Sequence, residues 1–197
     1  MAETPLRTAD LVRRAQAGDD EAYERLFARV TSRLLAYVRI RLGSDLRARL
    51  DPLDVVQEAY VRAHVAFPQF EQRDEQAFGR WLCTIADHCL KDLAEHHGAQ
   101  KRTPPSPLVR GSAALTRIRA MHTNPLSRCA RQERAERLVA AMDQLDEPER
   151  EVLLLRYFQD MSVADVVATV GRSRATVLRQ LGTGRVKLGL LLREGTR

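Results

Sequence analysis

Cysteine and long apolar runs are scarce in this sequence. Its 197 residues include three cysteines, an odd number without a CxxC pair, which argues against a disulfide framework and favours a reducing compartment. No apolar stretch approaches the roughly 18 residues of a membrane span. The opening MAETPLRTAD also lacks the basic and then apolar order of a signal peptide. We therefore expect a cytoplasmic protein without membrane insertion.

Motifs for catalysis or for binding a cofactor are missing as well. The sequence has no Gly-rich phosphate-binding loop. Cysteines and histidines crowd one expected helix, but Cys83 and Cys89 are six residues apart and so lie on different helical faces. The crowded residues are Cys83, His88, Cys89, His96 and His97. We predict no metal site, no cofactor and no enzymatic activity.

Positive charge is unevenly distributed along the chain, whose formal net charge is +6. Residues 1–102 carry 16 basic and 16 acidic side chains, whereas residues 148–197 carry 9 basic and 5 acidic ones. Residues 171–193 contain no acidic residue at all. Such a segment is suited to a polyanion, although a solvated basic face is the alternative interpretation.

The first hundred residues show helical periodicity. A short helix is expected around residues 10–17, and a longer one should begin at Asp19 or Asp20 and end at Gly43. After a polar connection at residues 67–76, apolar residues at three-four spacing predict a further helix to about residue 97. The residues that carry this spacing are Phe78, Trp81, Leu82, Ile85, Cys89 and Leu93.

The segment DPLDVVQEAYVRAH, residues 51–64, predicts a helix with an unusual outer face. Asp51 is a favourable N-cap and Pro52 suits the first helical position. The face opposite the apolar residues forms an acidic and amide stripe without a basic residue, made of Asp54, Gln57 and Glu58. The stripe indicates a basic partner, or else a purely local role in which the carboxylates favour the helix dipole.

Residues 103–124 lack amphipathic order and contain three prolines within four positions, so we predict a linker there. It would join a helical domain at residues 10–102 to a second domain at residues 125–197. The expected fold class is therefore all-α, with two small helical domains.

The second domain carries a predicted helix-turn-helix. Ser162 and Asp165 have the spacing of a capping box, Gly171 supplies a tight turn, and a basic helix follows from Ser173. The start of that helix can enter the major groove or contact phosphates through Arg172, Ser173, Arg174, Thr176 and Arg179. A helical hairpin that only packs is the structural alternative.

Two glycines interrupt this basic helix. Gly182 and Gly184 each cost roughly 1 kcal/mol relative to alanine in a helix interior. We therefore expect the helix to bend or fray there, which would leave Arg185 and Lys187 less firmly held.

Three segments in this order resemble bacterial sigma factors of the extracytoplasmic-function (ECF) group. They are DPLDVVQEAYVRAH, AFGRWLCTIADHCLKDL and LDEPEREVLLLRYFQDMSVADVVATVGRSRATV. The likeness covers about residues 19–102 and 135–193. It implies an RNA polymerase subunit with two helical domains, called regions 2 and 4, that directs promoter recognition and transcription initiation.

The resemblance assigns roles to individual residues. In the family, the segment matching Asp54, Gln57 and Glu58 docks on the clamp helices of core RNA polymerase. Region 2 of family members reads the −10 element as single strand, and the matching positions here are Gln72, Arg73, Arg80, Thr84, His88 and Lys91. Region 4 reads the −35 element, at positions matching Arg172, Ser173, Arg174, Thr176 and Arg179. The expected partners are therefore core RNA polymerase and promoter DNA.

The sequence departs from the family pattern in two places. His88 stands where asparagine is common. After Val177, where a lysine and then a histidine-arginine pair are usual, this chain has Leu178 and then Gly182 and Thr183, so the promoter sequence that is read should be unusual. Family members are often controlled by an anti-sigma factor, which would be a further partner, but no residue here identifies one.

Two other functions fit parts of the sequence. A helix-turn-helix regulator that does not join polymerase would explain the basic C-terminal half but not the stripe at Asp54. A sigma-like protein that only sequesters polymerase or an anti-sigma factor is suggested by the departure around Gly182. Promoter opening by reconstituted polymerase distinguishes the three.

Overall fold

The structure is a computed structural model that describes residues 6–99 and 126–194. Within those ranges every regular element is helical, which confirms the predicted all-α fold. The predicted linker at residues 103–124 lies outside the described residues. The helices are α1 (Thr8–Gln16), α2 (Asp20–Arg47), α3 (Pro52–Ala66), the 3-10 helix η1 (Phe67–Gln69), α4 (Ala77–Ala99), α6 (Leu126–Asp143), α7 (Glu147–Tyr157), α8 (Val163–Val170) and α9 (Arg174–Glu194). None of these helices has the length and apolar content that crossing a bilayer requires.

Local capping starts several of these helices where the sequence predicts. The Asp19 side chain accepts a hydrogen bond from Ala22 N at 2.9 Å, and Asp51 accepts one from Leu53 N at 2.9 Å. Each bond satisfies one of the backbone donors that a helix N-terminus leaves unpaired. Ser162 and Asp165 form the predicted capping box.

The predicted helix end at Gly43 is confirmed, but a second helical segment follows it within α2. Gly43 has φ 63° and ψ 174°, which kinks the helix, but helical structure resumes and continues to Arg47. Glycine tolerates this backbone conformation because it has no Cβ. The extra turn is held from a distance, because the Arg47 guanidinium bonds the carboxylate of Asp143 in α6. That long-range pair is what a pattern based on neighbouring residues misses.

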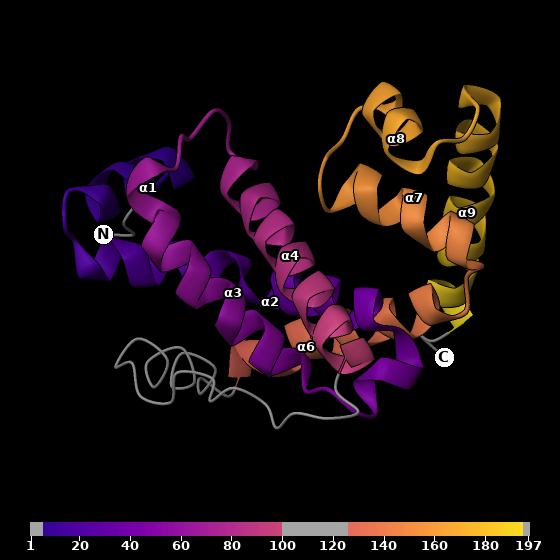
Figure 1. Cartoon of the computed structure of the whole chain (residues 1–197), viewed down its shortest axis with the longest axis horizontal. Coiled ribbons are helices and arrows are strands. Elements are labelled where there is room, and N and C mark those ends of the chain that lie inside the picture. Colours follow the sequence, from indigo (N-terminus) through magenta and orange to yellow (C-terminus); the bar gives the residue numbers. More distant parts are fainter. Residues whose placement is uncertain (1–5, 100–125, 195–197) are drawn as a thin grey trace.

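The N-terminal helices pack around a cluster of aromatic rings. Phe78 is fully buried, and its ring centroid lies 5.1 Å from that of Phe27. Trp81 is half-buried, and its ring centroid lies 4.7 Å from that of Phe70, which precedes α4. These contacts fix α4 against α2 and α3, and Figure 1 shows α3 beside α4 with α2 behind them.

Helices α7, α8 and α9 form the C-terminal cluster, with α8 and α9 joined as a helix-turn-helix (Figure 1). Val166 of α8 and Val177 of α9 are both fully buried. Between them, Gly171 adopts a left-handed conformation with φ 64°, which glycine enters without a steric penalty. The tight turn at Gly171 and the apolar contact between α8 and α9 therefore hold the N-terminal part of α9 in place.

Helix α9 continues through both glycines, so the predicted bend or fray is wrong. A Cβ at Gly184 would lie 3.1 Å from the Leu153 side chain, so this glycine allows α9 to approach α7 closely. Next to it, Glu149 accepts hydrogen bonds from Thr183 at 2.8 Å and from Lys187 at 2.9 Å. Lys187 is thus firmly held, contrary to the prediction.

The two halves of the chain share one apolar core. Helix α6 packs along α2 and also contacts α9, and the connected cluster of buried residues includes members of both halves. Figure 1 shows α6 passing behind α2 and α4 toward the C-terminal cluster. The described chain therefore has its C-terminal cluster docked on its N-terminal helices.

Candidate functional site

The acidic stripe on α3 is narrower than the sequence indicates. Asp54 is exposed, and Gln57 and Glu58 are half-buried. Arg62, one turn further on, donates to Glu58 Oε1 at 2.8 Å and to Asp92 Oδ2 at 2.6 Å. The prediction of a stripe without a basic residue is therefore wrong.

Arg62 was missed although its spacing from Glu58, four residues, is itself a signal for a helical ion pair. The hydrogen bonds from Arg62 to Glu58 and Asp92 raise the pKa of the guanidinium, so the arginine stays charged. Among the described residues Asp54 has no ion pair. Asp54 is thus the least neutralised acid of the stripe.

The candidates on α4 share one face. Arg80, Thr84, His88 and Lys91 recur at spacings of three and four residues, which places them in line along the helix. Thr84, His88 and Lys91 are exposed, whereas Arg80 is half-buried. The structure thus brings these four side chains together as one row.

The two remaining region 2 candidates lie in the loop before α4. Arg73 is exposed and its guanidinium lies 3.5 Å from Glu71. The Gln72 amide donates to the carbonyl of Asp74. Its Oε1 atom is buried and has no hydrogen-bond partner in the described part of the chain. An unsatisfied acceptor of this kind is uncommon in folded proteins.

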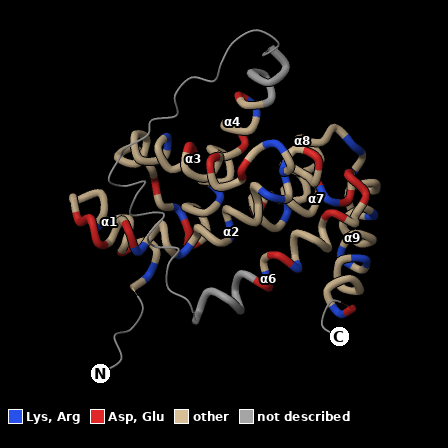
Figure 2. The backbone as a smooth tube through the Cα atoms, turned by 90° about the horizontal axis from the view of Figure 1, so that it is seen from below, with Lys and Arg blue, Asp and Glu red and all other residues tan. Residues whose placement is uncertain are grey.

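The candidates at the start of α9 divide into structural and exposed residues. Arg172 is directed back toward α7, with its guanidinium 3.5 Å from Glu151. Ser173 Oγ accepts from Thr176 N at 3.2 Å and lies 2.9 Å from Thr176 Oγ1, which is a capping role. The remaining two, Arg174 and Arg179, are exposed and make no ion pair among the described residues. Figure 2 shows basic residues spaced along α9.

The comparisons with known proteins agree on one family. The model of the ECF sigma factor family matches residues 6–194. The chain belongs to the ECF sigma factor family. It is therefore a sigma factor, a protein that directs transcription initiation, as the sequence motifs predict.

This sigma factor is similar to two named relatives and to one solved structure. It is 30% identical to the RNA polymerase sigma-H factor of Pseudomonas aeruginosa, covering 93% of this chain and 95% of that protein. It is 26% identical to the ECF RNA polymerase sigma factor BldN of Streptomyces coelicolor, covering 87% of this chain but only 60% of BldN. A structure of CnrH in complex with the cytosolic domain of CnrY is similar with a TM-score of 0.49 and 26% identity, covering 93% of this chain and 96% of CnrH.

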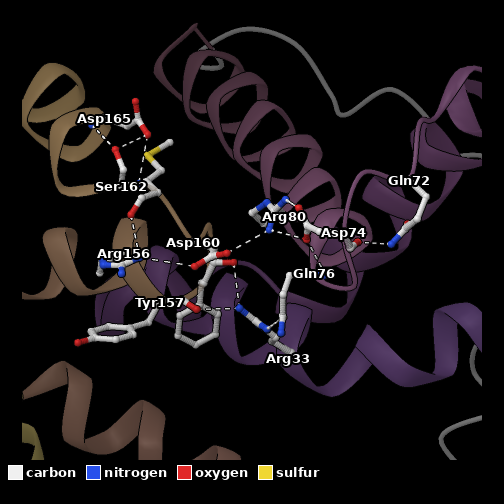
Figure 3. A network of polar contacts seen from close by, with 12 residues as sticks. Arg33, Gln72, Asp74, Gln76, Arg80, Arg156, Tyr157, Asp160, Ser162 and Asp165 are labelled. Carbon is white, nitrogen blue, oxygen red and sulfur yellow. Dashed lines mark hydrogen bonds and ion pairs between the residues drawn. The ribbon is translucent and has the colours of Figure 1, made fainter. Parts of the chain in front are cut away.

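In this sigma factor the row on α4 touches the C-terminal cluster. Arg80 donates to Asp74 Oδ1 at 3.0 Å and to Asp160 Oδ2 at 3.2 Å (Figure 3). The hydrogen bond from Arg80 lowers the pKa of Asp74, so this acid stays ionised. Arg80 is consequently neutralised from two sides.

The same contact region contains a buried polar cluster of the sigma factor. Gln159, which is buried, donates to Tyr37 Oη at 2.6 Å and to Asp87 Oδ2 at 2.7 Å. Tyr37 Oη also donates to Asp87, and Arg41 lies 3.2 Å from the same carboxylate. Burial raises the pKa of the Tyr37 phenol, so it remains a donor. Asp87, which precedes His88, is thereby a structural acceptor.

A second arginine holds the end of α7. Arg33 of α2 donates to the carbonyl oxygens of Tyr157 at 2.7 Å and Phe158 at 3.1 Å. These carbonyls close a helix C-terminus, where a cation is favoured. The sequence did not predict Arg33, Gln159 or Asp160 as functional, because their partners are far away along the chain and leave no local pattern.

Proposed function

We propose that this sigma factor joins core RNA polymerase through α3 and reads promoter DNA with α4 and α9. The supporting observation is the separation of unpaired charge. Asp54 is exposed without an ion pair on α3, while Arg174 and Arg179 are exposed without one on α9, among the described residues. Acid on one helix suits the basic clamp helices, and base on the other suits DNA.

On α3, the polymerase contacts are Asp54, Gln57 and Glu58. Asp54 contributes most, because Glu58 is already bonded by Arg62. The carboxylates approach a basic partner as charge-complementary groups, which favours rapid association and fixes the orientation of docking. The sigma factor acts by binding rather than by catalysis, in the cytoplasm, where polymerase and DNA meet.

On α4, the row of Arg80, Thr84, His88 and Lys91 follows the single-stranded −10 element, together with Gln72 and Arg73. Lys91 and Arg73 offer charge to phosphates, and Thr84 and His88 offer hydrogen bonds to bases. The unsatisfied Gln72 Oε1 supports this role, because a base amino group could supply the missing donor once the loop moves.

On α9, Arg174 and Arg179 read or clamp the −35 element, and Ser173 and Thr176 shape the start of the helix. Arg172 assists by fixing the turn to α7 through Glu151. In a helix-turn-helix, the N-terminal half of the second helix enters the major groove, and in this chain that helix is α9.

The two modules, residues 10–102 and 125–197, must separate to read both elements. Elements at −10 and −35 lie about 25 base pairs apart, which is about 85 Å of duplex at 3.4 Å per step. A compact chain of this length has a radius of gyration of about 16 Å. The docked arrangement therefore spans only one element, and residues 103–124 serve as the linker that lets the modules part. Control by an anti-sigma factor stays a prediction.

A charge reversal at Asp54 tests the polymerase assignment. Asp54→Lys should abolish or strongly weaken binding to core polymerase in a pull-down, while helicity by circular dichroism stays unchanged. Asp45→Lys is the matched control, because Asp45 is also exposed and the change in net charge is the same. Equal binding by both variants would refute the docking assignment.

A further inference from the structure

The outward face of α9 is unexpectedly apolar at its start. Leu178 is 47% exposed, and Ala175, three residues earlier, is also exposed. The buried face of the same turns is formed by Val177 and Leu181. At about 100° per residue, Ala175 lies roughly 120–160° around the helix from Val177 and Leu181, whereas Leu178 lies roughly 60–100° from them, at the edge of the exposed face.

The surface around these side chains is open and positively charged. A Cβ at Gly182, one turn after Leu178, would meet nothing within 4 Å. Arg174 and Arg179 flank Leu178 and have no ion pair among the described residues. Residues 171–193 contain no acidic residue. The partner of this face should therefore be a polyanion that also offers an apolar group to Leu178.

DNA offers one apolar group to a helix in its major groove. Thymine presents a C5-methyl group there, and cytosine, adenine and guanine carry no methyl group. Arginine side chains can pair with guanine or phosphate, but they gain little from a methyl group. An exposed leucine between two free arginines therefore has a specific target in the groove.

We propose that Leu178, supported by Ala175, reads the methyl group of a thymine in the −35 element. This rests on the proposed function, in which α9 enters the major groove. Leu178 is then a specificity residue, while Arg174 and Arg179 supply affinity and further contacts. Because leucine replaces the lysine that is usual at this position, the preferred base should change.

Thymine and uracil differ only in this methyl group, which gives a sharp test. Full-length sigma factor is assembled with core polymerase, and a −35 element is selected from randomised duplexes with a fixed −10 element. Each selected thymine is then replaced by deoxyuridine. The wild type should select thymine at one position or more and lose about fourfold in affinity on one replacement, as expected for exposing one buried methyl group.

The variant Leu178→Ala should bind the thymine and uracil duplexes equally. Val186→Ala is the matched control, because Val186 is also exposed on this helix, two turns further on; it should keep the fourfold preference. Thermal denaturation should show both variants folded, since both side chains are exposed.

Three results would overturn the proposal. Selection without thymine, equal binding of both duplexes by the wild type, or an unchanged thymine preference in Leu178→Ala would each do so while leaving −35 recognition in place. A holoenzyme with no −35 preference at all would instead refute the proposed function together with the proposal.

Discussion

The guanidinium of Arg80 lies 3.2 Å from the carboxylate of Asp160, and this pair links α4 to the loop between α7 and α8 (Figure 3). Arg80 belongs to the row proposed to follow the −10 strand. In the docked arrangement its charge is balanced by Asp160 and Asp74. Reading the −10 element with Arg80 therefore requires the contact with Asp160 to break.

Removing the charge of Asp160 should expose Arg80. Asp160 has a positive φ of 52°, which asparagine tolerates well, so Asp160→Asn removes charge without new backbone strain. We expect a rise of up to about fivefold in the affinity of the free chain for a single-stranded −10 oligonucleotide, which corresponds to an exposed ion pair. Fluorescence anisotropy measures it. Asp45→Asn removes a distant exposed carboxylate, and an equal rise there would show that net charge alone is responsible.

Gln159 should matter for the docking of the two halves. Replacing it with leucine removes its hydrogen bonds to Tyr37 and Asp87 in a buried setting. We expect Gln159→Leu to lower the free energy of unfolding by about 1–3 kcal/mol, because buried polar groups lose a partner. Urea denaturation gives the value. Gln144→Leu, on an exposed side chain, should change stability by no more than about 0.5 kcal/mol. Similar losses in both variants would contradict the role of the buried cluster.

The two glycines of α9 should respond oppositely to alanine. Gly182→Ala fills open space and should stabilise the protein by roughly 0.5–1 kcal/mol through helix propensity. Gly184→Ala places a Cβ 3.1 Å from Leu153, so overpacking should destabilise it by about 1–3 kcal/mol. Thermal unfolding of the two variants measures both changes in stability. Stabilisation by both substitutions would mean that α9 and α7 are not closely packed.

Cys83 and Cys89 should be unreactive in the folded protein. Burial raises the pKa of the Cys83 thiol to about 12 and that of Cys89 to about 11, so the reactive thiolate is scarce at pH 8 and increases as the pH rises toward these values. Iodoacetamide should label both residues slowly in native buffer and rapidly in urea, as mass spectrometry of their peptides measures. Rapid native labelling at pH 8 would contradict this buried placement.

The parts of the fold that could be predicted from the sequence depend on residues that are close together along the chain. Asp51 and Pro52 start α3, and Ser162 and Asp165 cap α8, because capping needs side chains only a few positions apart. The break at Gly43 was predicted as well, but the helical segment after it was not, because Arg47 is held by Asp143, 96 residues away. Local pattern carries no information on such a pair.

The candidate site divides in the same way. Motif spacing located the stripe at Asp54 and the basic start of α9, since both lie on single helices. Whether a charged side chain is free depends on tertiary partners, as Arg80 with Asp160 shows. Arg62 is intermediate: its bond to Glu58 follows from spacing within α3, but its bond to Asp92 in α4 requires the fold.

Promoter opening by a reconstituted polymerase tests the central claim most directly. Core polymerase is combined with the full-length chain on a duplex library, and run-off transcripts are sequenced. The account predicts transcripts that depend on the chain, start downstream of shared −10 and −35 elements, and disappear with Asp54→Lys but not with Asp45→Lys. Sequence-specific duplex binding without any transcript, or polymerase binding that never opens DNA, would contradict it.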